Sequence, residues 1–90
     1  MKFKPDDMCI TVTGGHADLY PENLGRIVTI TGLNGVFDGD VMYEFISNFP
    51  LRHRDLGLSL TGTIYETNLR LVKGGGLKLT APAKELTLQP

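Results

Sequence analysis

The chain has 90 residues, a formal net charge of −1 at pH 7, and hydrophobic and charged contents of 41% and 21%. A chain this short builds one core, so we expect a single β-barrel domain over residues 1–90. Nine Lys and Arg stand against ten Asp and Glu, so the basic excess of a dedicated nucleic-acid binder is absent. The hydrophobic content argues against wholesale disorder.

The N-terminal residues and the cysteine usage predict a cytoplasmic protein. A single cysteine, Cys9, excludes an internal disulfide and is typical of a reducing compartment. Lys2 and Lys4 are followed by Pro5 and two aspartates rather than by an apolar stretch, which predicts no signal peptide. No run of about 18 apolar residues is present to span a membrane. We therefore expect no membrane association.

The first predicted strand follows the N-terminal residues. Eleven glycines and five prolines favour short strands joined by tight turns. Within residues 8–13 the residue types alternate, so that Met8, Ile10 and Val12 make one face of the strand firmly apolar.

The segment Gly14–Ile30 contains two glycines, a polar loop, and then Gly25, which introduces a run of β-branched residues. A phosphate-binding loop needs backbone N–H groups converging at a helix N-terminus, usually with a lysine. Here a strand follows, and Asp18 and Glu22 would repel phosphate. We therefore interpret the segment as a bend between two strands, with Gly25 in a conformation that disfavours a side chain and Ile27 as a candidate core residue.

The next two segments are a turn region and an ambiguous element. Residues 33–40 contain an Asn-Gly and an Asp-Gly pair, which are both strong turn signals. Residues 40–49 fit a strand with its aromatic side chains on one face. They also fit a helix that begins at an Asp40 N-cap and stops at Pro50. The β-like surroundings favour the strand.

The last third of the chain reads as further strands. Residues 52–58 form a charged loop, residues 58–67 alternate as a strand, and residues 68–80 predict a β-hairpin that turns at 74–76. Residues 86–88 fit a last short strand. The hairpin leucines share one face: Leu69, Leu71, Leu77 and Leu79.

These elements predict an all-β fold, a small barrel of five or six strands with room for one short helical turn. Closing the sheet removes exposed edges, which a chain this small could not otherwise cover.

At the start of the chain, the spacing of alternating apolar residues and glycines is similar to that of a known family of sequence elements. The residues involved are Asp7, Met8, Ile10, Val12, Gly14, Gly25, Ile27, Val28 and Ile30. In these, the N-terminal third resembles a KOW-type element, the strand–loop–strand unit of ribosomal proteins and transcription elongation factors. Such elements sit in Src-homology-3-type barrels, so the resemblance implies that barrel type and an RNA- or DNA-binding role.

Three further stretches, Phe3–Asp7, Asn23–Val28 and Leu86–Pro90, are similar to segments of small barrel proteins encoded by phages and prophages. This second resemblance implies an accessory protein of a phage or prophage.

No group of residues suggests catalysis. Two histidines and one cysteine are too few for a metal cluster, and no Ser–His–Asp or Cys–His arrangement can be argued. We therefore expect no enzyme, no cofactor and no bound metal, and a monomer or weak dimer.

The leading expectation is a protein-binding module that contacts its partner through two loops. The candidate residues are Leu19, Tyr20, Glu22, Asn23, Arg52, His53 and Arg54. The alternative is nucleic-acid binding through a local basic patch, for which the candidates are Arg52, Arg54, Arg70, Lys73 and Lys78.

Overall fold

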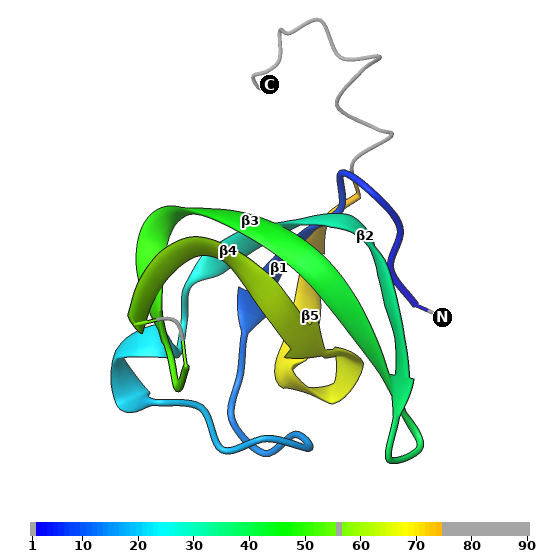
Figure 1. The fold of residues 1–90 in the computed structure, drawn as a ribbon. Coiled ribbons are helices and arrows are strands. Elements are labelled where there is room, and N and C mark those ends of the chain that lie inside the picture. The colour runs from blue at the N-terminus through cyan, green and yellow to red at the C-terminus, as the bar shows by residue number, and fades with distance from the viewer. Residues whose placement is uncertain (1, 56, 75–90) are drawn as a thin grey trace, which may run out of the picture.

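The computed structural model describes residues 2–55 and 57–74, which form an all-β fold. Five strands lie in one antiparallel sheet in the order β4-β3-β2-β1-β5, which confirms the expected fold class (Figure 1). Two short 3₁₀ helices, η1 (Pro21–Asn23) and η2 (Glu66–Asn68), accompany them, where one helical turn was expected. The strands are β1 (Met8–Thr11), β2 (Ile27–Phe37), β3 (Asp40–His53), β4 (Gly57–Tyr65) and β5 (Leu69–Lys73).

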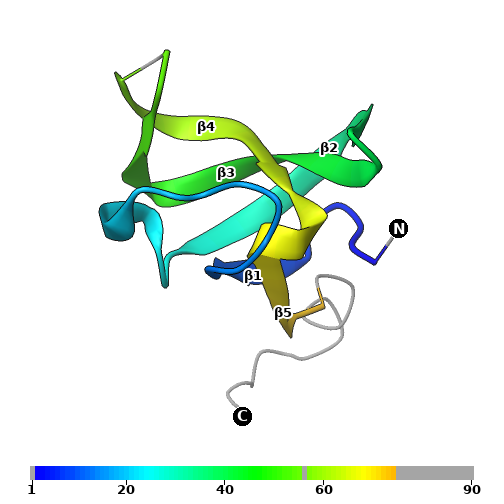
Figure 2. The same ribbon diagram turned by 90° about the horizontal axis from the view of Figure 1, so that it is seen from below.

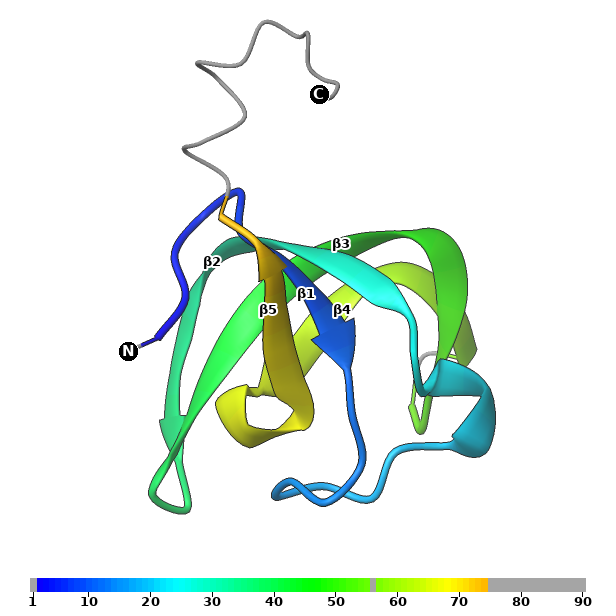
Figure 3. The same cartoon turned by 180° about the vertical axis from the view of Figure 1, so that it is seen from behind.

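The sheet curls on itself into a barrel-like shape (Figures 1 and 2). The register of β2 against β3 shifts between Ile30 and Gly32 and again between Leu33 and Gly35, and that of β3 against β4 shifts after Ile46. Such bulges bend a strand and increase its twist. The turn η2 joins the edge strands β4 and β5, so the two ends of the sheet meet there, and Figure 3 shows β5 beside β1.

The core lies on the concave face of the sheet. Tyr43, on β3, links the core to the N-terminal segment and to η2: its hydroxyl accepts a hydrogen bond from the Phe3 N–H at 3.1 Å and donates one to Glu66 Oε2 at 2.5 Å. Burial, and then the hydrogen bond to Glu66, raise the pKa of Tyr43. The buried apolar residues are Phe3, Cys9, Val28, Ile30, Tyr43, Phe45, Leu51, Ile64 and Leu69.

The segment 40–49 is a strand, as favoured from its surroundings, and it forms most of β3. The Asp-Gly pair, Asp38–Gly39, makes the two-residue turn into it, with φ of 52° and 80°. Positive φ at both positions is the signature of a type I′ hairpin turn. The turn predicted at the Asn-Gly pair is wrong, because Asn34–Gly35 lies within β2 at a bulge.

The face of β1 predicted to be firmly apolar is not the buried one. Cys9 and Thr11 are fully or almost fully buried, whereas Met8 and Ile10 are only partly buried. In the register of β1 with β5, Cys9 pairs with Leu71 and Thr11 with Leu69, which places these small side chains on the concave face. The interior beside β1 therefore takes its small residues, and the larger apolar ones lie outside.

The prediction that Ile27 is a core residue is also wrong. Ile27 is 37% exposed, while Val28 and Ile30 are 1% and 0% exposed. Ile27 pairs with Ile10, and both lie on the convex face. Because side chains alternate along a strand, an error of one residue exchanges the two faces.

The charged loop predicted over residues 52–58 is shorter, since β3 continues to His53 and β4 begins at Gly57. The first arm of the predicted hairpin is β5, where Leu69 and Leu71 share a face as expected, although only Leu69 is buried. Its second arm and the last predicted strand lie outside the described residues.

Candidate functional site

The loop between β1 and β2 packs against η2 through the buried side chain of Asn68. Asn68 Oδ1 accepts a hydrogen bond from the Ala17 N–H at 3.0 Å, and Nδ2 donates to the carbonyls of Ala17 and Val12 at 3.0 and 3.2 Å. Gly15 approaches so closely that a Cβ there would lie 2.5 Å from the Thr67 carbonyl oxygen. The glycine at this position therefore serves close packing of the bend.

A second buried amide, that of Asn23, joins the same loop to the end of β3. Its Oδ1 accepts a hydrogen bond from the Arg52 N–H at 2.9 Å, and its Nδ2 donates to the Arg52 carbonyl at 2.8 Å. The Thr11 hydroxyl donates to the Asn23 carbonyl and accepts from the Arg26 N–H. These bonds fix the backbone of Arg52 independently of the conformation of the Arg52 side chain.

The side chains of Tyr20, Glu22 and Arg52 meet on the surface above this link. Arg52 Nε forms a short ion pair with Glu22 Oε2, and its guanidinium lies 5.6 Å from the centre of the Tyr20 ring. The pKa of Glu22 is lowered, first by a hydrogen bond from its own backbone N–H and then by the Arg52 side chain. A cation over an aromatic face is attracted by the ring quadrupole. The three side chains thus restrain one another.

His53, the next residue along, turns its ring inward instead. The ring stacks on Phe45 with centroids 6.2 Å apart. Gly62 provides the room for it, since a Cβ on that glycine would overlap His53 Cε1. Among the described residues, His53 Nε2 has no hydrogen-bond partner and is buried.

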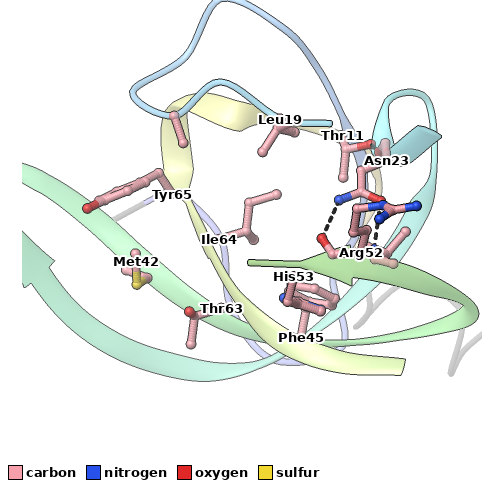
Figure 4. A pocket seen from close by; sticks show the side chains of 12 residues that line it. Thr11, Leu19, Asn23, Met42, Phe45, Arg52, His53, Thr63, Ile64 and Tyr65 are labelled. Carbon is pink, nitrogen blue, oxygen red and sulfur yellow. Dashed lines mark hydrogen bonds between the residues drawn. The ribbon is translucent and has the colours of Figure 1, made fainter. Parts of the chain in front are cut away.

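A half-enclosed pocket of about 150 Å³ lies beneath the loop (Figure 4). The loop supplies one wall, the end of β3 a second, and β4 a third. Its lining is mainly apolar, with the Asn23–Arg52 link at one side (Figure 4). The lining residues are Thr11, Ala17, Leu19, Asn23, Met42, Phe45, Leu51, Arg52, His53, Thr63, Ile64 and Tyr65.

The structure brings together most of the residues predicted to contact a partner. Leu19, Tyr20, Glu22 and Asn23 come from one loop, and Arg52 and His53 from β3, and all six lie around the pocket or in direct contact with Arg52. Asn23 and His53 are largely turned inward, whereas Tyr20, Glu22, Arg52 and Arg54 are exposed.

The basic residues of the alternative do not form one patch. Arg70 and Lys73 are exposed on β5, which is separated from β3 in the sheet by β2 and β1. Lys78 lies outside the described residues. Arg52 is already paired with Glu22.

Sequence reasoning missed the walls of the pocket. Phe45, Thr63 and Ile64 reach it from β3 and β4, and only the curvature of the sheet makes them neighbours of the loop. One local signal was available: Gly62 interrupts an otherwise β-prone run, and a glycine inside a strand often marks the close approach of another group.

The chain matches no protein-family model, no curated protein and no solved structure among those compared. Within residues 2–55 and 57–74, no three His, Cys, Asp or Glu side chains gather where they could hold a metal ion. In the same part of the chain, no helix has the length and apolar character needed to cross a membrane.

Proposed function

We propose that this protein is a non-catalytic protein-interaction module whose partner binds where the β1–β2 loop meets the end of β3. The observation that carries the proposal is the contact of Tyr20 and Glu22 with the Arg52 side chain beside a half-enclosed apolar pocket. We call this region the Tyr20–Arg52 surface; it comprises Leu19, Tyr20, Glu22, Arg52 and Arg54.

The composition and rigidity of the Tyr20–Arg52 surface support the proposal. Tyrosine and arginine dominate the energetics of protein interfaces because they combine large contact area with polar groups. The surface is held by the buried amides of Asn23 and Asn68, so little conformational freedom is lost when a partner binds. The neighbouring pocket offers space for an apolar side chain of the partner.

The resemblances noted from the sequence support a more specific assignment. The likeness to small phage- and prophage-encoded proteins supports the role of an accessory protein. The likeness to KOW-type elements, together with the curled five-stranded sheet, supports a barrel of Src-homology-3 type.

The alternative function, RNA or DNA binding, is favoured by one observation. Arg54, Arg70 and Lys73 are exposed, and none of them has an ion-pair partner among the described residues. Their separation on the sheet and the net charge of −1 favour the protein-binding function.

The proposal is tested by capture of partners from host lysate on the immobilised protein, with quantitative mass spectrometry. The variants Tyr20→Ala and Arg52→Ala remove side chains from the Tyr20–Arg52 surface, and Val72→Ala, at an exposed position of β5, is the matched control. We expect a protein that binds the wild type and Val72→Ala but is lost with the other two variants.

The affinity of the purified partner should then fall about tenfold or more for Tyr20→Ala. If every variant captures the same proteins, the surface is misassigned. A titration with mixed-sequence single-stranded RNA at low and physiological salt tests the alternative, since binding that persists at physiological salt would replace the protein-binding function.

A further inference from the structure

The two edge strands of the sheet differ in how they are protected. An edge strand presents unpaired backbone N–H and C=O groups, and proteins commonly block such edges with charged residues or proline. Strand β5 carries Arg70 and Lys73. Strand β4, with the sequence GLSLTGTIY, has neither a charged residue nor a proline over its nine residues.

The outer edge of β4 is free in the described part of the chain. β4 pairs with β3 alone, and Figure 2 shows it at the margin of the molecule, where only the turn that joins it to β3 reaches further out. Its side chains on that margin are exposed as well, including Leu58 at 68% and Leu60 at 46%. A long, uncharged edge with exposed leucines is a template for one more strand.

We propose that this edge pairs with β4 of a second copy of the chain, antiparallel and about a two-fold axis, so that the two sheets become continuous. In such a pairing the residue on the axis faces itself, and its near neighbours lie opposite or diagonal to their own counterparts, so a strand that pairs in this way must avoid charges near its centre. The absence of charge along all of β4 meets this requirement, whereas Arg70 and Lys73 on β5 violate it.

The middle of the strand indicates the register. Thr61 is the central residue of Gly57–Tyr65, and its side chain is exposed. A pairing centred there places Thr61 beside Thr61 of the other copy, and Thr–Thr pairs across strands are favourable. One added strand pair buries less than a standard interface, so we expect a Kd on the order of 10–100 µM.

The test is sedimentation velocity of the full chain at concentrations from well below to well above that Kd. The wild type should shift from monomer to dimer, and Thr61→Lys and Thr61→Glu should each remain monomeric because like charges then face one another across the axis. An equimolar mixture of the two variants should dimerise again. Val72→Lys, which adds the same charge to β5, should dimerise as the wild type does.

Far-UV circular dichroism checks that each variant is folded, and concentration-dependent amide-exchange protection of β4 in the wild type gives a second measurement that needs no variant. A wild type that stays monomeric throughout would overturn the proposal. So would dimerisation of Thr61→Lys alone, failure of the mixed variants to associate, or a β4 edge that binds an extended peptide from another protein but not its own copy. None of these results depends on the Tyr20–Arg52 surface.

Discussion

Ile30 and Ile27 lie three residues apart on β2 and have opposite burial, so the same substitution at each tests the register of the strand. Ile30 is 0% exposed and Ile27 is 37% exposed. Replacing either with alanine removes roughly three carbon atoms, and each buried one contributes about 0.8 kcal/mol. For Ile30 the transfer loss is therefore about 2.4 kcal/mol, and the cavity left behind raises the total to about 3–4 kcal/mol.

Ile27→Ala is expected to cost only about 1 kcal/mol, from its partial burial and the lower β-propensity of alanine. Urea unfolding followed by circular dichroism measures both losses, since the chain has no tryptophan. With a slope near 1 kcal/mol/M, as in small domains, Ile30→Ala should lower the midpoint by about 3 M. If Ile30→Ala does not fold, Ile30→Val serves as the replacement variant, with an expected loss of about 1 kcal/mol in the free energy of unfolding. A greater loss at Ile27 than at Ile30 would show that β2 is shifted by one residue, and equal losses would contradict the opposite burial of the two side chains.

Four further predictions concern the loop, the core and the glycines. Asn68→Ala leaves the loop groups at Ala17 unpaired, and we expect a loss of about 2–3 kcal/mol in urea unfolding together with faster exchange of the Ala17 amide. Gly25 has φ of 73° with open space around it, so Gly25→Ala should cost about 1–2 kcal/mol through backbone conformation alone, seen as a lower Tm. Burial, and then the charge of Asp7, raise the pKa of the Cys9 thiol to about 11 from 9.0, so this thiol should resist alkylation by iodoacetamide in the native protein. The free energy of unfolding should fall as the pH rises from 9 towards 11, because the thiol loses its proton in the unfolded chain before it does so in the folded protein. Gly62→Ala should displace the adjacent imidazole ring at a cost of about 1–3 kcal/mol, and unchanged ring resonances in NMR spectra would contradict the close contact.

The sequence predicted turns and strands correctly wherever a short stretch of residues determines its own backbone conformation. The Asp38–Gly39 turn followed from the tolerance of these two residue types for positive φ. The strand at 40–49 followed from its neighbours, and the positive φ of Gly25 from its place before a β-branched run. The Asn-Gly pair shows the limit, since Asn34–Gly35 has the same turn chemistry but is drawn into β2 by pairing with β3.

The faces of the first two strands were predicted wrongly for one reason. An alternating pattern shows that a strand has two faces, but which face is buried depends on the register with neighbouring strands. For β1 that neighbour is β5, more than 50 residues away in the sequence, and the pairing puts Cys9 and Thr11 inside. The bulges in β2 further break the alternation that a local pattern assumes.

The amino-acid sequence was enough to predict that this protein is all-β, where most of its strands and turns lie, and which polar residues its loops carry. That those residues lie in contact with one another could be seen only in the three-dimensional structure. Tyr20 and Glu22 reach Arg52 because the Asn23 amide binds the Arg52 backbone across 29 residues of sequence. The pocket beside them likewise exists because the sheet curls, and the uncharged edge of β4 exists because the strand order places β4 at one end of the sheet.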